Sequence, residues 1–126
     1  MREPAVESLV RQYLEGQGYS TVARSRPTGP DILATKDGRT LLVEVKGDRP
    51  GHQSSPATVH VDTLTLIGQI VLRRSRREAD EFAVAIRPVH RRLVEQALAT
   101  LRELSIRVLL VEDTGIHELR DAHVAQ

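Results

Sequence analysis

Asp31, Glu44 and Lys46 are the residues of this chain whose types and spacing best suit chemistry. Two carboxylates brought together repel each other, and a hard divalent cation such as Mg²⁺ offsets that repulsion because it prefers one or two carboxylate ligands. The other Mg²⁺ ligands are then waters and substrate phosphate. An ammonium group beside such a pair stabilises developing negative charge. The three residues predict a metal-assisted site, provided that the fold brings them together.

A β-hairpin would bring the two acids together. Residues 31–36 and 40–46 are apolar, β-branched runs, and Asp37-Gly38 between them is the strongest short-range hairpin signal. A symmetric two-residue turn pairs residues whose numbers add to the same sum as 37 and 38. Asp31 is therefore predicted to lie opposite Glu44, with Cβ atoms about 4.5–5.5 Å apart.

The same register predicts the two faces of the hairpin. Ile32 pairs with Val43, and Ala34 with Leu41, so one face is wholly apolar. The opposite face carries Leu33 and Leu42 near the turn and the two acids at the open end. Lys46 shares the acidic face, one diagonal step away at about 7–8 Å between Cβ atoms, which a lysine side chain can span.

The elements around this hairpin follow from periodicity and from turn residues. The predicted elements are a helix that follows Pro4 and stops at Gly16-Gln17-Gly18, a strand over 19–25, a loop over 47–57, a helix capped by Asp62 and ending near Arg77, a strand over 81–86, a helix from Pro88, and a strand over 106–111. The last fourteen or so residues are expected to form a short helix or a frayed end. This order predicts an α/β fold with a mixed sheet.

Composition limits the class of protein. The 126 residues fit one domain over 1–126, and 40% apolar with 28% charged residues is ordinary for a globular chain. No cysteine is present, so disulfides and thiolate metal sites are ruled out. No apolar run suits a bilayer span or a secretory signal, which predicts a cytoplasmic protein that does not contact membranes. Of eighteen basic residues only Lys36 and Lys46 are lysines, although the net charge is only +1.

Two short segments resemble the PD-(D/E)XK nuclease superfamily. They are Gly29-Pro30-Asp31-Ile32 and Leu42-Val43-Glu44-Val45-Lys46-Gly47, closest to the Mrr-like and Holliday-junction-resolvase-like branches. The predicted order of elements also matches the restriction-endonuclease-like αβββαβ core of that family, a mixed sheet flanked by helices. The resemblance implies that Asp31, Glu44 and the Val45 carbonyl hold Mg²⁺, with Mn²⁺ as a substitute. It also implies that Lys46 positions or helps to activate the attacking water.

The resemblance adds two further residues to the predicted catalytic set. Glu7 in the first helix and Gln69 in the later helix stand at the family's flanking polar positions. The exonuclease branch continues this glutamine into a QxxxY pattern, whereas Arg73 stands where the tyrosine would be. This departure argues against an exonuclease of that type.

Nucleic-acid contact has two candidate regions. Arg73, Arg74, Arg76 and Arg77 form a basic end on the helix, which suits either phosphate contact or interaction with the helix dipole. In the loop, Arg49, His52, Gln53, Ser54 and Ser55 suit DNA contact or a mobile polar segment. The five histidines have no paired ligand spacing and are expected at the surface, without metal.

The sequence therefore predicts a Mg²⁺-dependent DNA endonuclease. A domain this small covers little DNA, and a double-strand cut needs two active sites, so a homodimer is expected. Two alternatives stay open: a non-catalytic DNA-binding or assembly module that keeps the nuclease fold, and a nuclease directed at RNA or at a particular nucleic-acid structure.

Overall fold

The computed structural model contains both helices and strands, and it describes residues 1–24 and 26–121. In order, the elements are α1 (Glu3–Gly16), β1 (Ser20–Ala23), β2 (Ile32–Lys36), β3 (Arg39–Val45), the short 3-10 helix η1 (Gly51–Gln53), α2 (Pro56–Ser75), β4 (Glu81–Ile86), α3 (Pro88–Glu103), β5 (Ile106–Glu112) and β6 (Gly115–Leu119). The stretch from α1 to β4 has the predicted αβββαβ order.

The six strands within the described residues form one mixed sheet in the order β1-β2-β3-β4-β5-β6. The pairs β1–β2, β2–β3 and β5–β6 are antiparallel. The pairs β3–β4 and β4–β5 are parallel, each joined through a crossover helix. The prediction of an α/β fold with a mixed sheet is confirmed.

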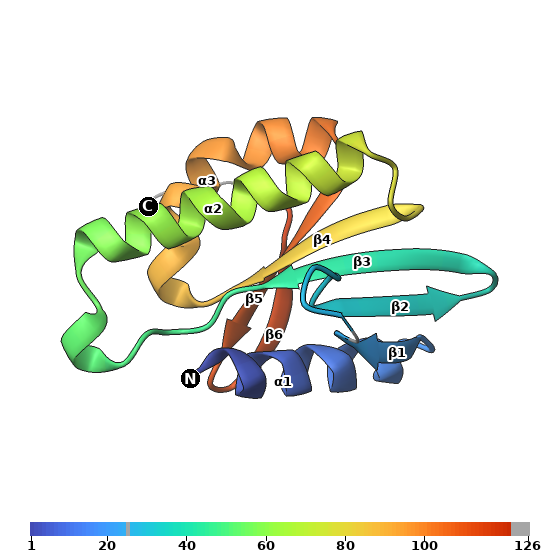
Figure 1. Ribbon diagram of the computed structural model, residues 1–126, viewed down its shortest axis with the longest axis horizontal. Coiled ribbons are helices and arrows are strands. Elements are labelled where there is room, and N and C mark those ends of the chain that lie inside the picture. Colours follow the sequence, from blue (N-terminus) through green and yellow to red (C-terminus); the bar gives the residue numbers. More distant parts are fainter. Residues whose placement is uncertain (25, 122–126) are drawn as a thin grey trace.

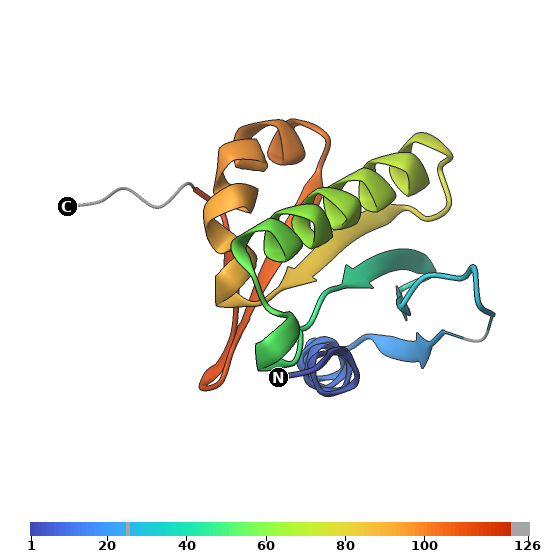
Figure 2. The same ribbon diagram turned by 60° about the vertical axis from the view of Figure 1, so that its left-hand side comes forward.

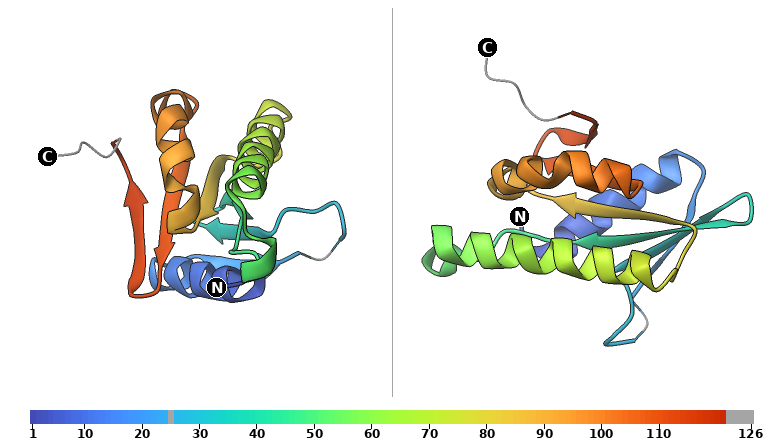
Figure 3. Two further views of the ribbon diagram at one scale, coloured as in Figure 1. Left: turned by 90° about the vertical axis from the view of Figure 1, so that its left-hand side faces the viewer. Right: turned by 90° about the horizontal axis from the view of Figure 1, so that it is seen from above.

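Helices cover both faces of the sheet (Figure 1). Helix α1 packs on one face against a cluster that includes Ile32, Val43 and Ala85, whereas α2 and α3 pack on the other against Leu42, Val84 and Leu110. Figures 2 and 3 show this three-layer arrangement from other sides, with α2 and α3 next to each other. None of the described helices is long and apolar enough to cross a membrane.

The β2–β3 hairpin has the predicted register. Asp37 and Gly38 take positive φ angles of 52° and 77°, as a type I′ turn requires. Ile32 pairs with Val43, and Ala34 pairs with Leu41. Continuing this register past the last ladder pair places Asp31 opposite Glu44.

Helix α2 begins earlier than predicted. The sequence prediction placed its N-cap at Asp62, but the helix starts at Pro56 and the Ser55 side chain caps it by accepting the Thr58 amide at 3.1 Å. Pro56 suits this start because the first turn of a helix does not need its missing N–H. The loop predicted over 47–57 is correspondingly shorter and contains η1.

The end of the chain also differs from the prediction. Residues 115–119 form neither a helix nor a frayed end but strand β6, which pairs with β5. Leu119 is buried in the core cluster beneath α3 and lies opposite Val108. Short strands of this kind are stabilised by a partner strand, so their local pattern is a weak signal.

The end of β3 lies very close to the start of α1 at Gly47. A Cβ atom at Gly47 would lie 2.3 Å from the Glu3 nitrogen and 2.7 Å from the Arg2 carbonyl carbon. The same junction is closed by the Met1 ammonium, 2.8 Å from an Asp48 carboxylate oxygen. Glycine is therefore required here for space.

We expect Gly47→Ala to lower the free energy of unfolding by about 1–3 kcal/mol, because backbone atoms must move apart. Urea denaturation measures the change. Gly51→Ala is the matched control, since a Cβ at Gly51 meets nothing within 4 Å. Equal stability of the two variants would contradict the close approach.

Candidate metal centre at the open end of the β2–β3 hairpin

Asp31 and Glu44 lie side by side at the open end of the hairpin, and both are buried with 3% of their surface exposed. Asp31 directly precedes β2, and Glu44 is the penultimate residue of β3. Glu44 also has Val84 of β4 as its other neighbour across the sheet. The predicted acid pair is thus shielded from solvent, where like charges repel more strongly than they do in water.

Asp31 is held by two groups. Its Oδ2 accepts the Val45 amide N–H at 2.7 Å, which fixes the carboxylate where the β2–β3 ladder ends. Its Oδ1 forms a close ion pair with the Arg24 guanidinium. The β1–β2 register, in which Ala23 pairs with Ile32, continues to place Arg24 opposite Asp31. Sequence reasoning missed Arg24, because the connection between β1 and β2 is not a two-residue turn that reveals the register.

Glu44 has a different environment. Its Oε1 lies in a close ion pair with Arg73 Nε of α2, yet that atom accepts no hydrogen bond among the described residues. Burial raises the pKa of the Glu44 carboxyl to about 7, and hydrogen bonding to and repulsion by Asp31 add to the rise. Arg73 acts in the opposite direction. Glu44 therefore has Arg73 as its cationic partner, whereas Asp31 has both a cation and a backbone amide.

The donor set suits a hard divalent cation. Two carboxylates and, next to Glu44 in the chain, the Val45 carbonyl are oxygen ligands of the kind that Mg²⁺ prefers. Glu44 Oε1 is buried and, apart from its ion pair with Arg73, accepts no hydrogen bond among the described residues, which supports the fit. Among residues 1–24 and 26–121, no group of three or more His, Asp or Glu residues is arranged to hold a metal. A cation here would therefore depend on the two acids, the carbonyl, water and a substrate.

Lys46 lies at the same end of β3 but is engaged elsewhere. Its Nζ is 3.7 Å from Glu3 Oε1 and 3.9 Å from Asp62 Oδ1, and its side chain is 27% exposed. The lysine thus sits between the start of α1 and the first half of α2. It is near the acid pair in the fold, and its described ion pairs are with neither acid.

The two residues added by the family resemblance lie in different surroundings. Glu7 on α1 is half-buried, and burial, together with repulsion by Asp31 and Glu3, raises the pKa of its carboxyl. It is therefore close enough to Asp31 for the charge of that carboxylate to raise its pKa. Gln69 lies on α2 with an exposed side chain, and no described hydrogen bond joins it to either acid.

Several of the residues predicted to contact nucleic acid are tied within the protein. Arg49 donates to both oxygens of Asp62, at 2.7 and 2.8 Å, and this pairing holds the pKa of the Asp62 carboxyl below its usual range. Arg74 donates to the Leu104 carbonyl at the end of α3. Arg73 belongs to the acid site described above.

The other predicted contacts are more open. Gln53 is exposed in η1, and Arg77 is exposed just beyond α2 with a positive φ of 56°. The His52 side chain lies outside the described part of the structure. Arg76 is 66% exposed, with a longer contact of 3.9 Å to Glu78.

One histidine does not lie at the surface as predicted. His90 is 1% exposed, and its Nδ1 accepts the Arg87 amide N–H at 3.1 Å. Burial lowers the pKa of this imidazole. The ring completes the cap of α3 beneath the buried Arg87, which pairs with Asp48 at 2.9 Å. This role could not be predicted from the sequence, because a histidine in the first turn of a helix is ordinarily solvated.

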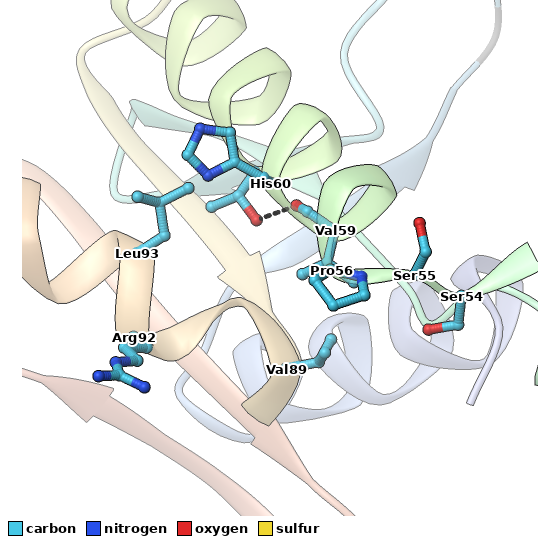
Figure 4. Close-up of a pocket in the computed structure, with 9 residues that line it drawn as sticks. Ser54, Ser55, Pro56, Val59, His60, Val89, Arg92 and Leu93 are labelled. Carbon is cyan, nitrogen blue, oxygen red and sulfur yellow. Dashed lines mark hydrogen bonds between the residues drawn. The ribbon is translucent and has the colours of Figure 1, made fainter.

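A separate cleft of about 430 Å³ lies between the first turns of α2 and α3 (Figure 4). Apolar side chains from both helices line it, among them Val59, Val89 and Leu93. The Thr63 hydroxyl near it donates to the Val59 carbonyl at 2.6 Å. Neither Asp31 nor Glu44 lines this cleft, so the acid pair is a distinct site.

Comparisons with known proteins support the class of fold. No protein-family model matches the chain. A UPF0102 protein of Aquifex aeolicus is 36% identical over 63 residues, which are 48% of this chain and 61% of that protein. The crystal structure of an XisH family protein from Nostoc punctiforme superposes with a TM-score of 0.58 and 18% identity, over 89% of this chain and 95% of that one. The observed αβββαβ order and this superposition support a restriction-endonuclease-like fold.

The raised pKa of Glu44 predicts a pH-dependent stability. The folded protein holds this proton up to about pH 7, whereas the unfolded chain releases it near 4.5, so the stability falls as pH rises between these values. With chelator present, the wild type should therefore lose stability relative to Glu44→Gln as the pH rises. The difference in free energy of unfolding between the two proteins should change by on the order of 2 kcal/mol from about pH 5 to about pH 8. Urea denaturation at both pH values measures this difference.

Glu103→Gln, at an exposed position ending α3, controls for the loss of one carboxylate. Because surface substitutions are usually nearly neutral, its free energy of unfolding should stay within about 0.5 kcal/mol of the wild type at both pH values. If Glu44→Gln behaved in the same way, Glu44 would titrate as an ordinary carboxyl.

Proposed function

We propose that this protein is a Mg²⁺-dependent endonuclease that hydrolyses DNA phosphodiester bonds. The observation that carries the proposal is the buried pair of Asp31 and Glu44, two carboxylates side by side at the open end of the hairpin. The restriction-endonuclease-like fold supports the proposal, and so does the hairpin register, which brings the residues of the two sequence motifs together. Mn²⁺ should substitute for Mg²⁺, since it accepts the same oxygen ligands.

Asp31, Glu44 and the Val45 carbonyl would hold the cation. When bound, Mg²⁺ supplies stabilisation of the charge that develops on phosphate and makes the attacking water more acidic. The Val45 amide holds Asp31 in place through a 2.7 Å hydrogen bond, so this ligand is already oriented in the free protein. Glu7 adds negative charge beside Asp31 and is the candidate for a supporting acid.

Lys46 would assist the water. In the reaction, water oxygen bonds to phosphorus while one P–O ester bond breaks, and the departing oxygen takes up a proton, leaving a phosphate monoester and a hydroxyl. The ammonium of Lys46, which lies between Glu3 and Asp62, can orient the water and stabilise the negative charge that forms. Gln69, being exposed, is assigned to substrate contact more readily than to metal binding.

One observation favours a second candidate, a non-catalytic DNA-binding or assembly module. Each acid already has a guanidinium partner, Arg24 for Asp31 and Arg73 for Glu44. Two acids and two arginines balance in charge without a metal. In such a module the four residues would stabilise the hairpin end only.

Chelator sensitivity separates the two candidates. We expect cleavage of plasmid DNA in Mg²⁺ and none in excess chelator, because the acids alone cannot neutralise the phosphate. Glu44→Ala and Lys46→Ala should each lower the Mg²⁺-dependent rate by about 100-fold or more. Duplex, single-stranded, four-way-junction and RNA substrates run in parallel identify the preferred nucleic acid.

Two variants serve as matched controls. Lys36→Ala removes the other lysine of the chain, which is exposed and hydrogen-bonded to the Gln17 carbonyl at 2.7 Å. Glu103→Gln removes an exposed acid. Both should cleave like the wild type. Cleavage that survives chelator and Glu44→Ala would overturn the assignment, and DNA binding without cleavage would favour the non-catalytic module.

We also propose that the active form is a homodimer, since cutting both DNA strands requires two active sites. Light scattering coupled to gel filtration should give the mass of two chains at the concentrations used for cleavage. A strict monomer that still makes double-strand breaks in one encounter would contradict this.

A further inference from the structure

Arg73 occupies a junction of three elements beside the acid pair. It lies in the last turn of α2, and its side chain is only 18% exposed. Its Nε faces Glu44 of β3, its Nη1 donates to Glu78 before β4 at 2.7 Å, and its Nη2 donates to the Thr28 carbonyl at 3.1 Å. All three guanidinium nitrogens therefore have partners, and the group covers the Glu44 side of the site.

Arg73 and a divalent cation would require the same atom. The Glu44 oxygen that faces Arg73 is Oε1, the buried oxygen that accepts no hydrogen bond among the described residues. A guanidinium cannot lose its charge in a protein, so it cannot make room by deprotonation. A guanidinium and a divalent cation that share one oxygen repel each other strongly, because both are positive and the site is largely shielded from water. Binding of one therefore weakens binding of the other.

Arg24 stands in a different relation to its acid. Its side chain is 44% exposed, and Asp31 keeps the Val45 amide as a hydrogen-bond donor whether or not Arg24 stays. Glu44 has no comparable second donor. The charge balance of Glu44 thus depends on Arg73 alone among the described residues, which makes Arg73 the cation that a metal must displace.

We propose that Arg73 is an exchangeable counter-ion, which closes the metal site in the free protein and moves from Glu44 to a DNA phosphate when metal and DNA bind. The inference rests on the proposed function and adds to it a phosphate-binding residue that couples the two ligands. A phosphate oxygen pair matches the planar fork of arginine as well as a carboxylate does. The exposed Arg77 lies just beyond α2 and extends the phosphate-binding surface.

Coupling of this kind has a measurable sign. The phosphate replaces Glu44 as the partner of Arg73, so DNA should raise the affinity for metal, and metal should raise the affinity for DNA by the same factor. Without Arg73 the metal site stands open, and the coupling disappears.

The test is calorimetric titration of Mg²⁺ alone into the full chain without DNA. Arg73→Gln should bind Mg²⁺ about 10-fold more tightly than the wild type, because one competing charge is gone. Arg76→Gln is the matched control on the same helix end and should change the affinity by less than about twofold, since its charge is screened by solvent. An Arg73→Gln protein that folds and binds Mg²⁺ no more tightly than the wild type would overturn the proposal.

A second measurement covers the case in which Arg73→Gln does not fold. In the wild type, the Arg73 Nε–H signal in a nitrogen–proton correlation spectrum, assigned by its loss in Arg73→Lys, should move on addition of Mg²⁺ and duplex DNA. A signal that stays unchanged while Mg²⁺ binds would also overturn the exchange. Phosphorothioate duplex, which hydrolyses slowly, keeps the DNA intact during the measurement.

Glu44→Gln separates failure of this inference from failure of the proposed function. If the wild type binds Mg²⁺ and Glu44→Gln does not, the metal site stands, and an unchanged Arg73→Gln affinity then refutes only the exchange. If the wild type binds no Mg²⁺ either alone or with DNA, the proposed function and the exchange both fail.

Discussion

The burial of Asp31 beside Glu44 is the constraint on which the rest of this site depends. Two carboxylates taken out of water need compensating charge, because an uncompensated buried ion costs several kcal/mol. The protein supplies that charge from both flanks, with Arg24 on Asp31 and Arg73 on Glu44. These two ion pairs link the end of strand β1 and helix α2 to the open end of the hairpin. The site and the packing around it therefore depend on the same contacts.

The hairpin was predictable because a two-residue turn fixes register. Asp37-Gly38 sets the pairing, and the pairing sets which side chains share a face. Arg24 escaped notice because a longer connection leaves the register of β1 open. Helix α2 was placed too late in the sequence because Asp62 looks like an N-cap, whereas its carboxylate is buried against Arg49. The strand β6 depends on pairing with β5, which local pattern does not reveal.

Internal pairing also explains why the composition says little about DNA. The chain has eighteen basic and seventeen acidic residues. Many of the arginines form ion pairs with acids or donate hydrogen bonds to carbonyls within the fold. Arg49 is held by Asp62 and Arg74 by the Leu104 carbonyl, so neither presents a free cation in the described structure. Net charge therefore reports the balance of the whole chain and not which individual arginines lack a partner within the fold.

The energetics of the acid pair bear on whether the protein is a scaffold or an enzyme. Leu42 precedes Glu44 on the same face of β3, and Val84 is its neighbour on β4, so an apolar side chain would fit this position without any counter-ion. Replacing a buried ion pair by apolar groups is often neutral or stabilising. Four charged residues at the end of one hairpin therefore carry a desolvation cost that apolar side chains would not. That cost is reasonable if the acids serve a cation for part of the protein's working cycle, which favours the nuclease over the inert module.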